Sequence, residues 1–413
     1  MKEIKREQYL NELVSSRENK LIKVITGIRR CGKSYLLDPI FKNYLLESGI
    51  KEDHIVKLDL DLIENKKYRE PMELFNYVMG KVTDKEMYYI LLDEIQLVDN
   101  FEDVLNSFLK KTNLDVYVTG SNSKFLSTDI VTEFRGRSTE IKIYPLSFSE
   151  FVELKNVSID TAWKEYILYG GLPPVILQED EKQKREYLHS LFETTYIKDI
   201  IERNDIKRKD VLDSVINILA SSVGSLTNPM NIYKTYTSVG DKDISINTIT
   251  SYIEYIENAF LVKKVERYDV KGRKYISTPF KYYFTDLGLR NVRLNFRQQE
   301  ENHIMENIIF NELLIRGYTV DVGVVETRNS DGRIYYEIDF ICNMASNRYY
   351  IQSALNIDSK EKNYQESRPL NCVGDNFKKI IVVKDDINPW YNEDGILIIG
   401  IKDFLLNKSS LSL

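Results

Sequence analysis

The sequence is poor in the side chains from which disulfide frameworks and metal centres are built. Its 413 residues include three cysteines, Cys31, Cys342 and Cys372, which are far apart and odd in number. This argues against a disulfide framework and against a CxxC metal site. The three histidines are equally scattered, so a histidine metal centre is not expected.

Long apolar runs and an excess of basic charge are also missing. No uninterrupted apolar run approaches the roughly 20 residues that cross a bilayer, and the charged first residues lack the apolar core of a secretory signal. We therefore expect a cytoplasmic protein with no membrane partner. The net charge of −6 gives no general attraction to nucleic acid, so such a contact would need a local basic patch. Length and composition predict an ordinary globular chain of several domains.

A glycine-bounded loop follows the first predicted strand. Residues 21–26 are rich in β-branched side chains, residues 27–34 have the pattern G-x-x-x-x-G-K-S, and the residues after them have the apolar spacing of a helix. In this context the pattern, called Walker A, cradles phosphate with backbone N–H groups. We expect Lys33 to reach the β- and γ-phosphates of ATP and Ser34 to bind Mg²⁺. The predicted nucleotide-binding residues are Gly27, Ile28, Arg29, Arg30, Cys31, Gly32, Lys33, Ser34 and Tyr35.

A second apolar strand ends in two acids, Asp93 and Glu94, in the run YYILLDE. Because the carboxyl ends of parallel strands converge at the ligand edge of a sheet, we expect these acids beside the phosphate loop. Asp93 is the predicted Mg²⁺ carboxylate of a Walker B strand. Glu94 is the predicted base that orients and polarises the attacking water. Without the loop, the two acids would indicate no more than an ordinary strand end.

Two further contributors to this site are expected after a third strand at residues 115–119. Asn122, or failing that Ser121, is placed to position the water or sense the γ-phosphate, although the same residues also suit a plain turn. Arg135 and Arg137 are candidates for an arginine that stabilises charge in the transition state. The alternative is that both arginines lie in solvent.

The motifs together resemble a known group. The phrases GIRR-x-GKS, LDEIQ, the GR before a strand, PLSF-x-EF and GGLP occur in this order, as in bacterial and archaeal AAA+-type ATPases with a C-terminal domain of unknown function. The resemblance implies an ATP-binding AAA+ core, dependence on Mg²⁺ and assembly with other subunits. It places the family's phosphate-binding and acidic residues on Lys33, Ser34, Asp93 and Glu94, and its arginine on Arg137.

The middle of the chain predicts a helical lid at residues 156–204 and a winged helix at 205–292. Three helical patterns, the third opening at Ser245, precede a hairpin with a turn at 271–273. A winged helix indicates DNA binding, but the third helix carries Glu254 and Glu257 and no lysine or arginine, which suits a protein-binding or spacer role. The basic residues of the hairpin are Lys263, Lys264, Arg267, Lys271, Arg273, Lys274 and Lys281.

The last predicted domain, residues 293–413, resembles the PD-(D/E)XK nuclease-like fold. The resemblance implies that Glu306 is the acid of the helix, Asp339 the metal-binding aspartate and Gln352 the acid or amide of the next strand. Glu337 lies two residues before Asp339, on the same face of the strand. The position of the expected lysine holds Ala354. We therefore expect a fold that has lost cleavage activity. The rival interpretation is a working site in which another lysine fills the gap.

The expected fold is α/β: an AAA+-like P-loop NTPase core at residues 1–155 with a parallel sheet, then the lid, the winged helix and the nuclease-like domain. The leading hypothesis is a Mg²⁺-dependent ATPase that couples nucleotide state to rearrangement of its C-terminal binding domains. The alternatives are an ATP-gated DNA-processing enzyme with a working nuclease and a nucleotide-regulated DNA-binding module. A protein partner and a homo-oligomer are compatible with each.

Overall fold

The computed structural model describes residues 4–120, 134, 136–239, 243–297, 300–329 and 332–413. By its internal contacts the chain forms two compact units, Met1–Pro145 and Leu146–Leu413. The division falls before the expected boundary at residue 155. None of the described helices is both long and apolar enough to cross a membrane.

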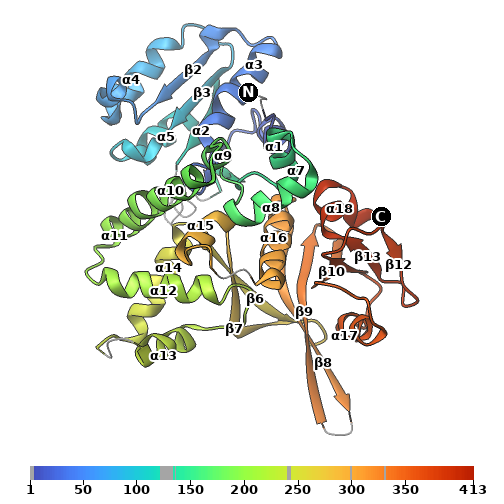
Figure 1. Cartoon of the computed structure of the whole chain (residues 1–413). Helices are drawn as coiled ribbons and strands as arrows, with labels where there is room; N and C mark the ends of the chain where they lie inside the picture. The colour runs from blue at the N-terminus through green and yellow to red at the C-terminus, as the bar shows by residue number, and fades with distance from the viewer. Residues whose placement is uncertain (1–3, 121–133, 135, 240–242, 298–299, 330–331) are drawn as a thin grey trace. The chain divides into compact units, whose positions relative to one another are not determined.

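The first unit is built around a five-stranded sheet in the order β2-β3-β4-β1-β5 (Figure 1). All of its neighbouring strands run parallel. In chain order its elements are α1 (Glu7–Ser15), β1 (Ile22–Gly27), α2 (Lys33–Tyr35), η1 (Leu36–Phe41), α3 (Lys42–Glu47), η2 (Glu52–His54), β2 (Ile55–Asp59), η3 (Ile63–Arg69), α4 (Pro71–Lys81), β3 (Tyr88–Asp93), η4 (Ile95–Leu97), α5 (Phe101–Leu109), β4 (Leu114–Thr119) and β5 (Ser138–Ile143).

Apolar strands and amphipathic helices explain this layered unit. Every residue of β1 and β3 is buried, as expected for strands of a parallel sheet covered on both faces. Helix α5 buries Phe101, Val104, Leu105 and Phe108, whose spacing places them on one helical face. The strand order sets β4 between β1 and β3, so the end of the third predicted strand lies between the loop and the acid pair, as the sequence predicted.

The second unit contains an eight-stranded sheet in the order β12-β13-β11-β10-β9-β8-β6-β7. Its helices are α7 (Phe148–Lys155), α8 (Ile159–Tyr169), α9 (Pro173–Ile176), α10 (Glu181–Leu191), η6 (Phe192–Ile197), α11 (Lys198–Asn204), α12 (Lys209–Ser221), α13 (Pro229–Val239), α14 (Ile246–Asn258), α15 (Leu287–Arg293), α16 (Glu301–Ile315), α17 (Lys360–Asn371), α18 (Ile401–Leu406) and η7 (Ser410–Ser412). Its strands are β6 (Val262–Asp269), β7 (Lys274–Phe284), β8 (Thr319–Asn329), β9 (Gly332–Met344), β10 (Asn347–Ala354), β11 (Lys378–Val383), β12 (Trp390–Tyr391) and β13 (Leu397–Gly400).

The predicted hairpin is not a free wing. Strands β6 and β7 form the expected antiparallel pair, and Ser245 caps α14 by accepting from the N–H of Thr248. However, β6 also pairs in parallel with β8, so the hairpin lies in one sheet with strands of the expected nuclease-like domain (Figure 1). The division of this unit at residues 204 and 292 stays a prediction.

A buried carboxylate joins the predicted lid to later residues of the same unit. Asp286 accepts hydrogen bonds from the N–H groups of Gly171, at 2.8 Å, and Leu289, at 3.1 Å. The adjacent helices also meet, because the Asn291 amide donates to main-chain oxygens of α8. Burial raises the pKa of Asp286 to about 6, although the backbone N–H donors oppose this. The predicted lid helices are therefore part of the second unit.

Candidate functional site

The loop after β1 needs glycine where the sequence has it. Gly27 has φ of 148°, and a Cβ atom there would lie 2.2 Å from the main-chain oxygen of Ile143. Gly32 has φ of 102° and precedes α2. Both conformations favour glycine over other residues. The backbone thus turns sharply at both ends of the predicted phosphate loop.

Lys33 opens the helix that follows the loop and is buried, with 4% of its surface exposed. Its Nζ donates to the main-chain oxygens of Gly27, at 3.1 Å, and Ile28, at 3.0 Å. The ammonium group is therefore held at the loop by the loop's own carbonyl groups. A positive charge in this position suits an anionic ligand.

Asp93, the last residue of β3, lies at the meeting point of two hydroxyl groups. Thr119 donates its hydroxyl to the Asp93 carboxylate, and the Ser34 side chain also hydrogen-bonds it. Burial raises the pKa of Asp93; these hydrogen bonds oppose the rise, and the nearby charges of Glu94 and Asp59 add to it. A buried carboxylate in a negative environment favours a bound cation, and its oxygen atoms with that of Ser34 are ligands that Mg²⁺ prefers.

Glu94 adopts a left-handed backbone conformation with φ of 54°. Such strain in a residue other than glycine is concentrated at functional sites. Its N–H donates to the Thr119 hydroxyl at 3.0 Å, and its carboxylate accepts from the Gln96 amide. One hydroxyl, that of Thr119, therefore contacts both acids. The sequence interpretation missed Thr119. Its position at the end of the strand between β1 and β3 was the available signal.

The remaining predicted residues are spread over the unit. Ile28 and Cys31 are buried in the loop, Arg29 is half-buried, and Arg30, Ser34 and Tyr35 are exposed. Arg137 is exposed before β5 and donates to the Asn106 side chain at 3.3 Å. Ser121, Asn122 and Arg135 lie outside the described residues.

The second unit brings together acids that the sequence singled out. Glu306, Glu337 and Asp339 meet around the ammonium group of Lys281. Lys281 is buried, so it does not contribute to a basic surface of the hairpin. Gln352 lies beside the cluster, since its Oε1 accepts from the Asp339 N–H at 3.4 Å. Ala354 is buried in the apolar core of the unit.

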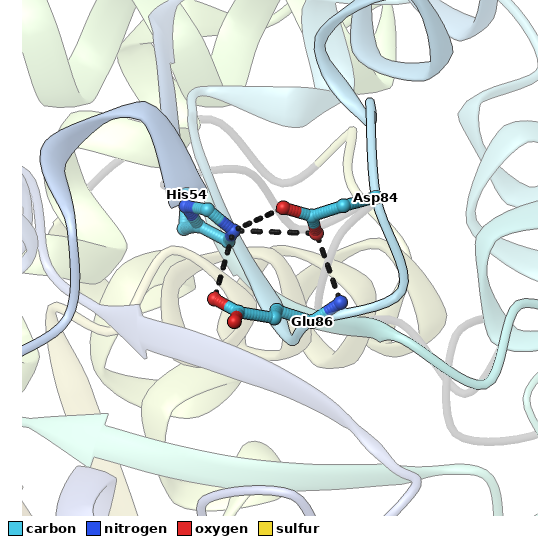
Figure 2. Close-up of side chains that lie close together, drawn as sticks. All are labelled: His54, Asp84 and Glu86. Atoms are coloured by element: carbon cyan, nitrogen blue, oxygen red, sulfur yellow. Dashed lines mark hydrogen bonds and ion pairs between the residues drawn. The ribbon is translucent and has the colours of Figure 1, made fainter.

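A third cluster is centred on His54 in η2. Its Nδ1 lies 2.7 Å from Asp53. Its Nε2 lies 3.2 Å from Asp84 and 3.4 Å from Glu86, as Figure 2 shows. Among the described residues, His54, Asp84 and Glu86 are the group whose ligand atoms approach closely enough for a metal ion. Both ring nitrogens face carboxylates, which suits an imidazolium donating from each nitrogen. The Asp53 hydrogen bond is the main cause that raises the pKa of His54. We interpret the group as an ion cluster.

Comparison with known proteins identifies the class of domain to which the first unit belongs. Residues 19–152 match the family model described as an AAA domain, and residues 160–300 match a domain of unknown function, DUF8612. The match and the parallel sheet define the first unit as a P-loop AAA+-type domain, a class that binds nucleotide.

The family follows from whole-chain relatives. An uncharacterized protein of Haemophilus influenzae is 37% identical over 412 residues, covering 98% of each chain. The chain belongs to the same family as that protein. An uncharacterized protein of Methanocaldococcus jannaschii is 29% identical, covering 92% of this chain and 85% of its own.

Solved structures show only distant likeness. The ADP form of the Aeropyrum pernix ORC2 protein is 10% identical, with a TM-score of 0.36, covering 73% of this chain and 92% of its own. The Aeropyrum pernix ORC1 protein in complex with DNA is 12% identical, with a TM-score of 0.28, covering 70% and 92%. These scores are too low to carry a conclusion.

Proposed function

We propose that the first unit binds ATP with Mg²⁺ and hydrolyses the bond between its β- and γ-phosphates. The observation that carries the proposal is the convergence of Ser34 and Thr119 on Asp93, next to the loop that holds Lys33. Phosphate loop, lysine, hydroxyl and carboxylate are the parts that P-loop NTPases use to hold a nucleotide and its metal. The AAA domain match over residues 19–152 supports the same assignment.

Mg²⁺ would be held by Ser34 and Asp93 and would neutralise charge on the phosphate groups. The residues from Gly27 to Tyr35 would surround the phosphates, with their N–H groups donating to the oxygens and Lys33 supplying a charge-assisted hydrogen bond. Glu94 would accept a proton from the attacking water, since it directly follows Asp93 and is positioned through Thr119. Asn122 as a phosphate sensor and Arg137 as an arginine acting on the γ-phosphate complete the proposal.

We further propose that nucleotide state changes the arrangement of C-terminal binding domains or of neighbouring subunits. DNA contact through the hairpin is the alternative. The contacts that the basic side chains of the hairpin already make argue against this alternative. Lys263 and Lys264 each lie within 4.0 Å of a glutamate carboxylate, and Lys271 donates to the main-chain oxygen of Glu326. Lysines that already face carboxylates, as Lys263 and Lys264 do, have less net charge to offer phosphate groups. A protein partner is therefore favoured over DNA.

Steady-state ATP hydrolysis with Mg²⁺, measured with and without single- and double-stranded DNA, tests these functions. A hydrolysis rate that neither form of DNA changes supports a protein partner. Stimulation by DNA that declines steeply with salt would instead support a DNA-processing or DNA-binding role. Failure to bind or hydrolyse ATP under any condition would contradict the proposal itself.

A further inference from the structure

A buried lysine of the second unit, Lys281, lies among three carboxylates from two other elements. Lys281 belongs to β7, Glu306 to α16, and Glu337 and Asp339 to β9. Its Nζ lies 2.7 Å from Glu306 Oε1, 2.9 Å from Glu337 Oε1 and 3.4 Å from Asp339 Oδ1. An ammonium group has three N–H donors and no acceptor. Each donor of Lys281 therefore has one carboxylate within reach.

Burial makes this pairing obligatory. The side chains of Lys281, Glu306 and Asp339 are 4%, 5% and 11% exposed, while Glu337 is about one-third exposed. Charged groups removed from water are tolerated when they are paired and hydrogen-bonded. Removing the lysine would leave three carboxylates close together, with His303, whose Nδ1 lies 3.8 Å from Glu306 Oε2, as the remaining basic group.

Other groups also donate hydrogen bonds to these carboxylates. The Tyr283 hydroxyl donates to Glu306 Oε1, and the Ser353 N–H donates to Asp339 Oδ2 at 2.9 Å. Asp339 also lies at an irregularity in the β8–β9 ladder, where the register shifts between Asp321 and Gly323. Bulged strands redirect side chains in this way next to functional sites. The acids are thus held by their own elements as well as by the lysine.

We infer that Glu306, Glu337 and Asp339 form a cation site in which the Lys281 ammonium is the resident cation. This inference is independent of the proposed ATPase activity. Ala354 stands where the nuclease-like fold would have a lysine, and Lys281 is another lysine that contacts the acids. It lies at the centre of the cluster and neutralises their charge. The wild-type cluster therefore needs no metal ion.

The electrostatics of the cluster agree with a permanently charged lysine. Burial works to lower the pKa of Lys281, but the charges of Asp339, Glu306 and Glu337 outweigh it and raise the pKa above its ordinary value. Burial and the Glu306 charge raise the pKa of Asp339 to about 7, and the Lys281 charge opposes this rise. The raised pKa agrees with a protonated lysine in the cluster.

The cluster also fastens two parts of the unit together. Lys281 lies within the segment that matches the domain of unknown function, residues 160–300, whereas all three acids follow it in sequence. Helix α16 lies along the sheet that carries both strands (Figure 1). The cluster thus ties the hairpin of the matched segment to the acids on α16 and β9.

Replacing the resident cation tests the inference. Lys281→Ala in the full chain is expected to lower the melting temperature, and millimolar Mn²⁺ without nucleotide is expected to restore much of the loss. The double variant Lys281→Ala/Asp339→Asn is the matched control and should show no restoration. Because the lysine already fills the cluster, Mn²⁺ should stabilise wild-type protein no more than it stabilises the double variant. Failure of Mn²⁺ to stabilise a folded Lys281→Ala variant more than the double variant would overturn the inference.

A second measurement needs no destabilised variant. Mn²⁺ binding to nucleotide-free protein, followed by the loss of the free Mn²⁺ electron paramagnetic resonance signal, is compared between wild type and Glu337→Gln. Equal binding is expected, because the lysine already fills the cluster. A Mn²⁺ site that Glu337→Gln removes, or DNA cleavage that depends on Asp339, would show that a metal binds beside the lysine and would overturn the inference. Neither result depends on ATP hydrolysis.

Discussion

The hydroxyl of Thr119, at the end of β4, donates to the carboxylate of Asp93, at the end of β3. The same hydroxyl accepts the N–H of Glu94 at 3.0 Å. Because β4 lies between β1 and β3, this one side chain links the acid pair to the strand beside the phosphate loop. Thr119 is therefore a positioning residue for both acids of the proposed ATPase site.

Thr119→Val should separate positioning from binding. The valine keeps the shape and the buried methyl group, but it removes the hydrogen bonds to Asp93 and Glu94. A lost hydrogen bond of this kind costs about 1–3 kcal/mol, so kcat is expected to fall by about tenfold to a hundredfold while KM for ATP changes little. Thr112→Val, at an exposed position before the same strand, is the control and should leave both constants unchanged. A Thr119→Val variant with wild-type kcat would contradict the positioning role.

Lys33→Ala should weaken nucleotide binding. The ammonium group is buried at the loop, and charge-assisted hydrogen bonds to phosphate are worth about 1.5–3 kcal/mol. We expect the affinity for a fluorescent ATP analogue to fall by roughly tenfold to a hundredfold. Lys42→Ala, whose lysine pairs with Glu52 at the surface, is the matched control. Equal affinities of the two variants for the ATP analogue would show that Lys33 does not contribute to nucleotide binding.

Arg137 is exposed, which leaves it accessible to a neighbouring subunit. If it acts between subunits, mixing Arg137→Ala protein with Glu94→Gln protein should restore part of the ATPase activity that each variant lacks. The restored rate is measured in mixtures whose hetero-oligomers have been verified. No restoration in such mixtures would assign Arg137 to its own chain or to the solvent.

The sequence predicted the elements of the candidate site better than the contacts among them. The pattern around Lys33 and the apolar strand before Asp93 are local, so the loop and the acid pair fell where they were expected. The predicted helix after the loop is interrupted at Asp38, whose φ of −148° and ψ of 118° are not helical. Thr119 was missed because its partners lie 25 and 26 residues away, on a different strand. Asn122 stays a prediction.

In the second unit, too, the sequence did not reveal which elements contact one another. The sequence analysis counted Lys281 among the basic residues of the hairpin, whereas the structure places it against Glu306, 25 residues further on, and Asp339, 58 residues further on. Periodicity indicates which face of a strand a side chain occupies, but it does not reveal which element covers that face. The pairing of β6 with β8 decides this, and no local pattern encodes it.

The His54 cluster should make the stability of the first unit depend on pH. The pKa of His54 is raised, so the folded state binds the proton more tightly than the unfolded state. This contribution is fully present below the unfolded pKa, about 6.5, and is lost as pH rises through the raised folded pKa. We expect His54→Gln to lower the melting temperature more at pH 5.5 than at pH 8.5. A loss of equal size at both pH values would show that the imidazolium is not what stabilises the cluster.

The central claim, that this chain hydrolyses ATP with Glu94 as the base, is tested most directly by single-turnover hydrolysis in wild type and Glu94→Gln, with ATP affinity measured on the same samples. The amide cannot accept the proton of the attacking water, but it is close in size to the carboxylate. We predict unchanged ATP affinity and a rate lower by roughly a hundredfold or more. A Glu94→Gln variant that binds ATP and hydrolyses it at the wild-type rate would contradict the account.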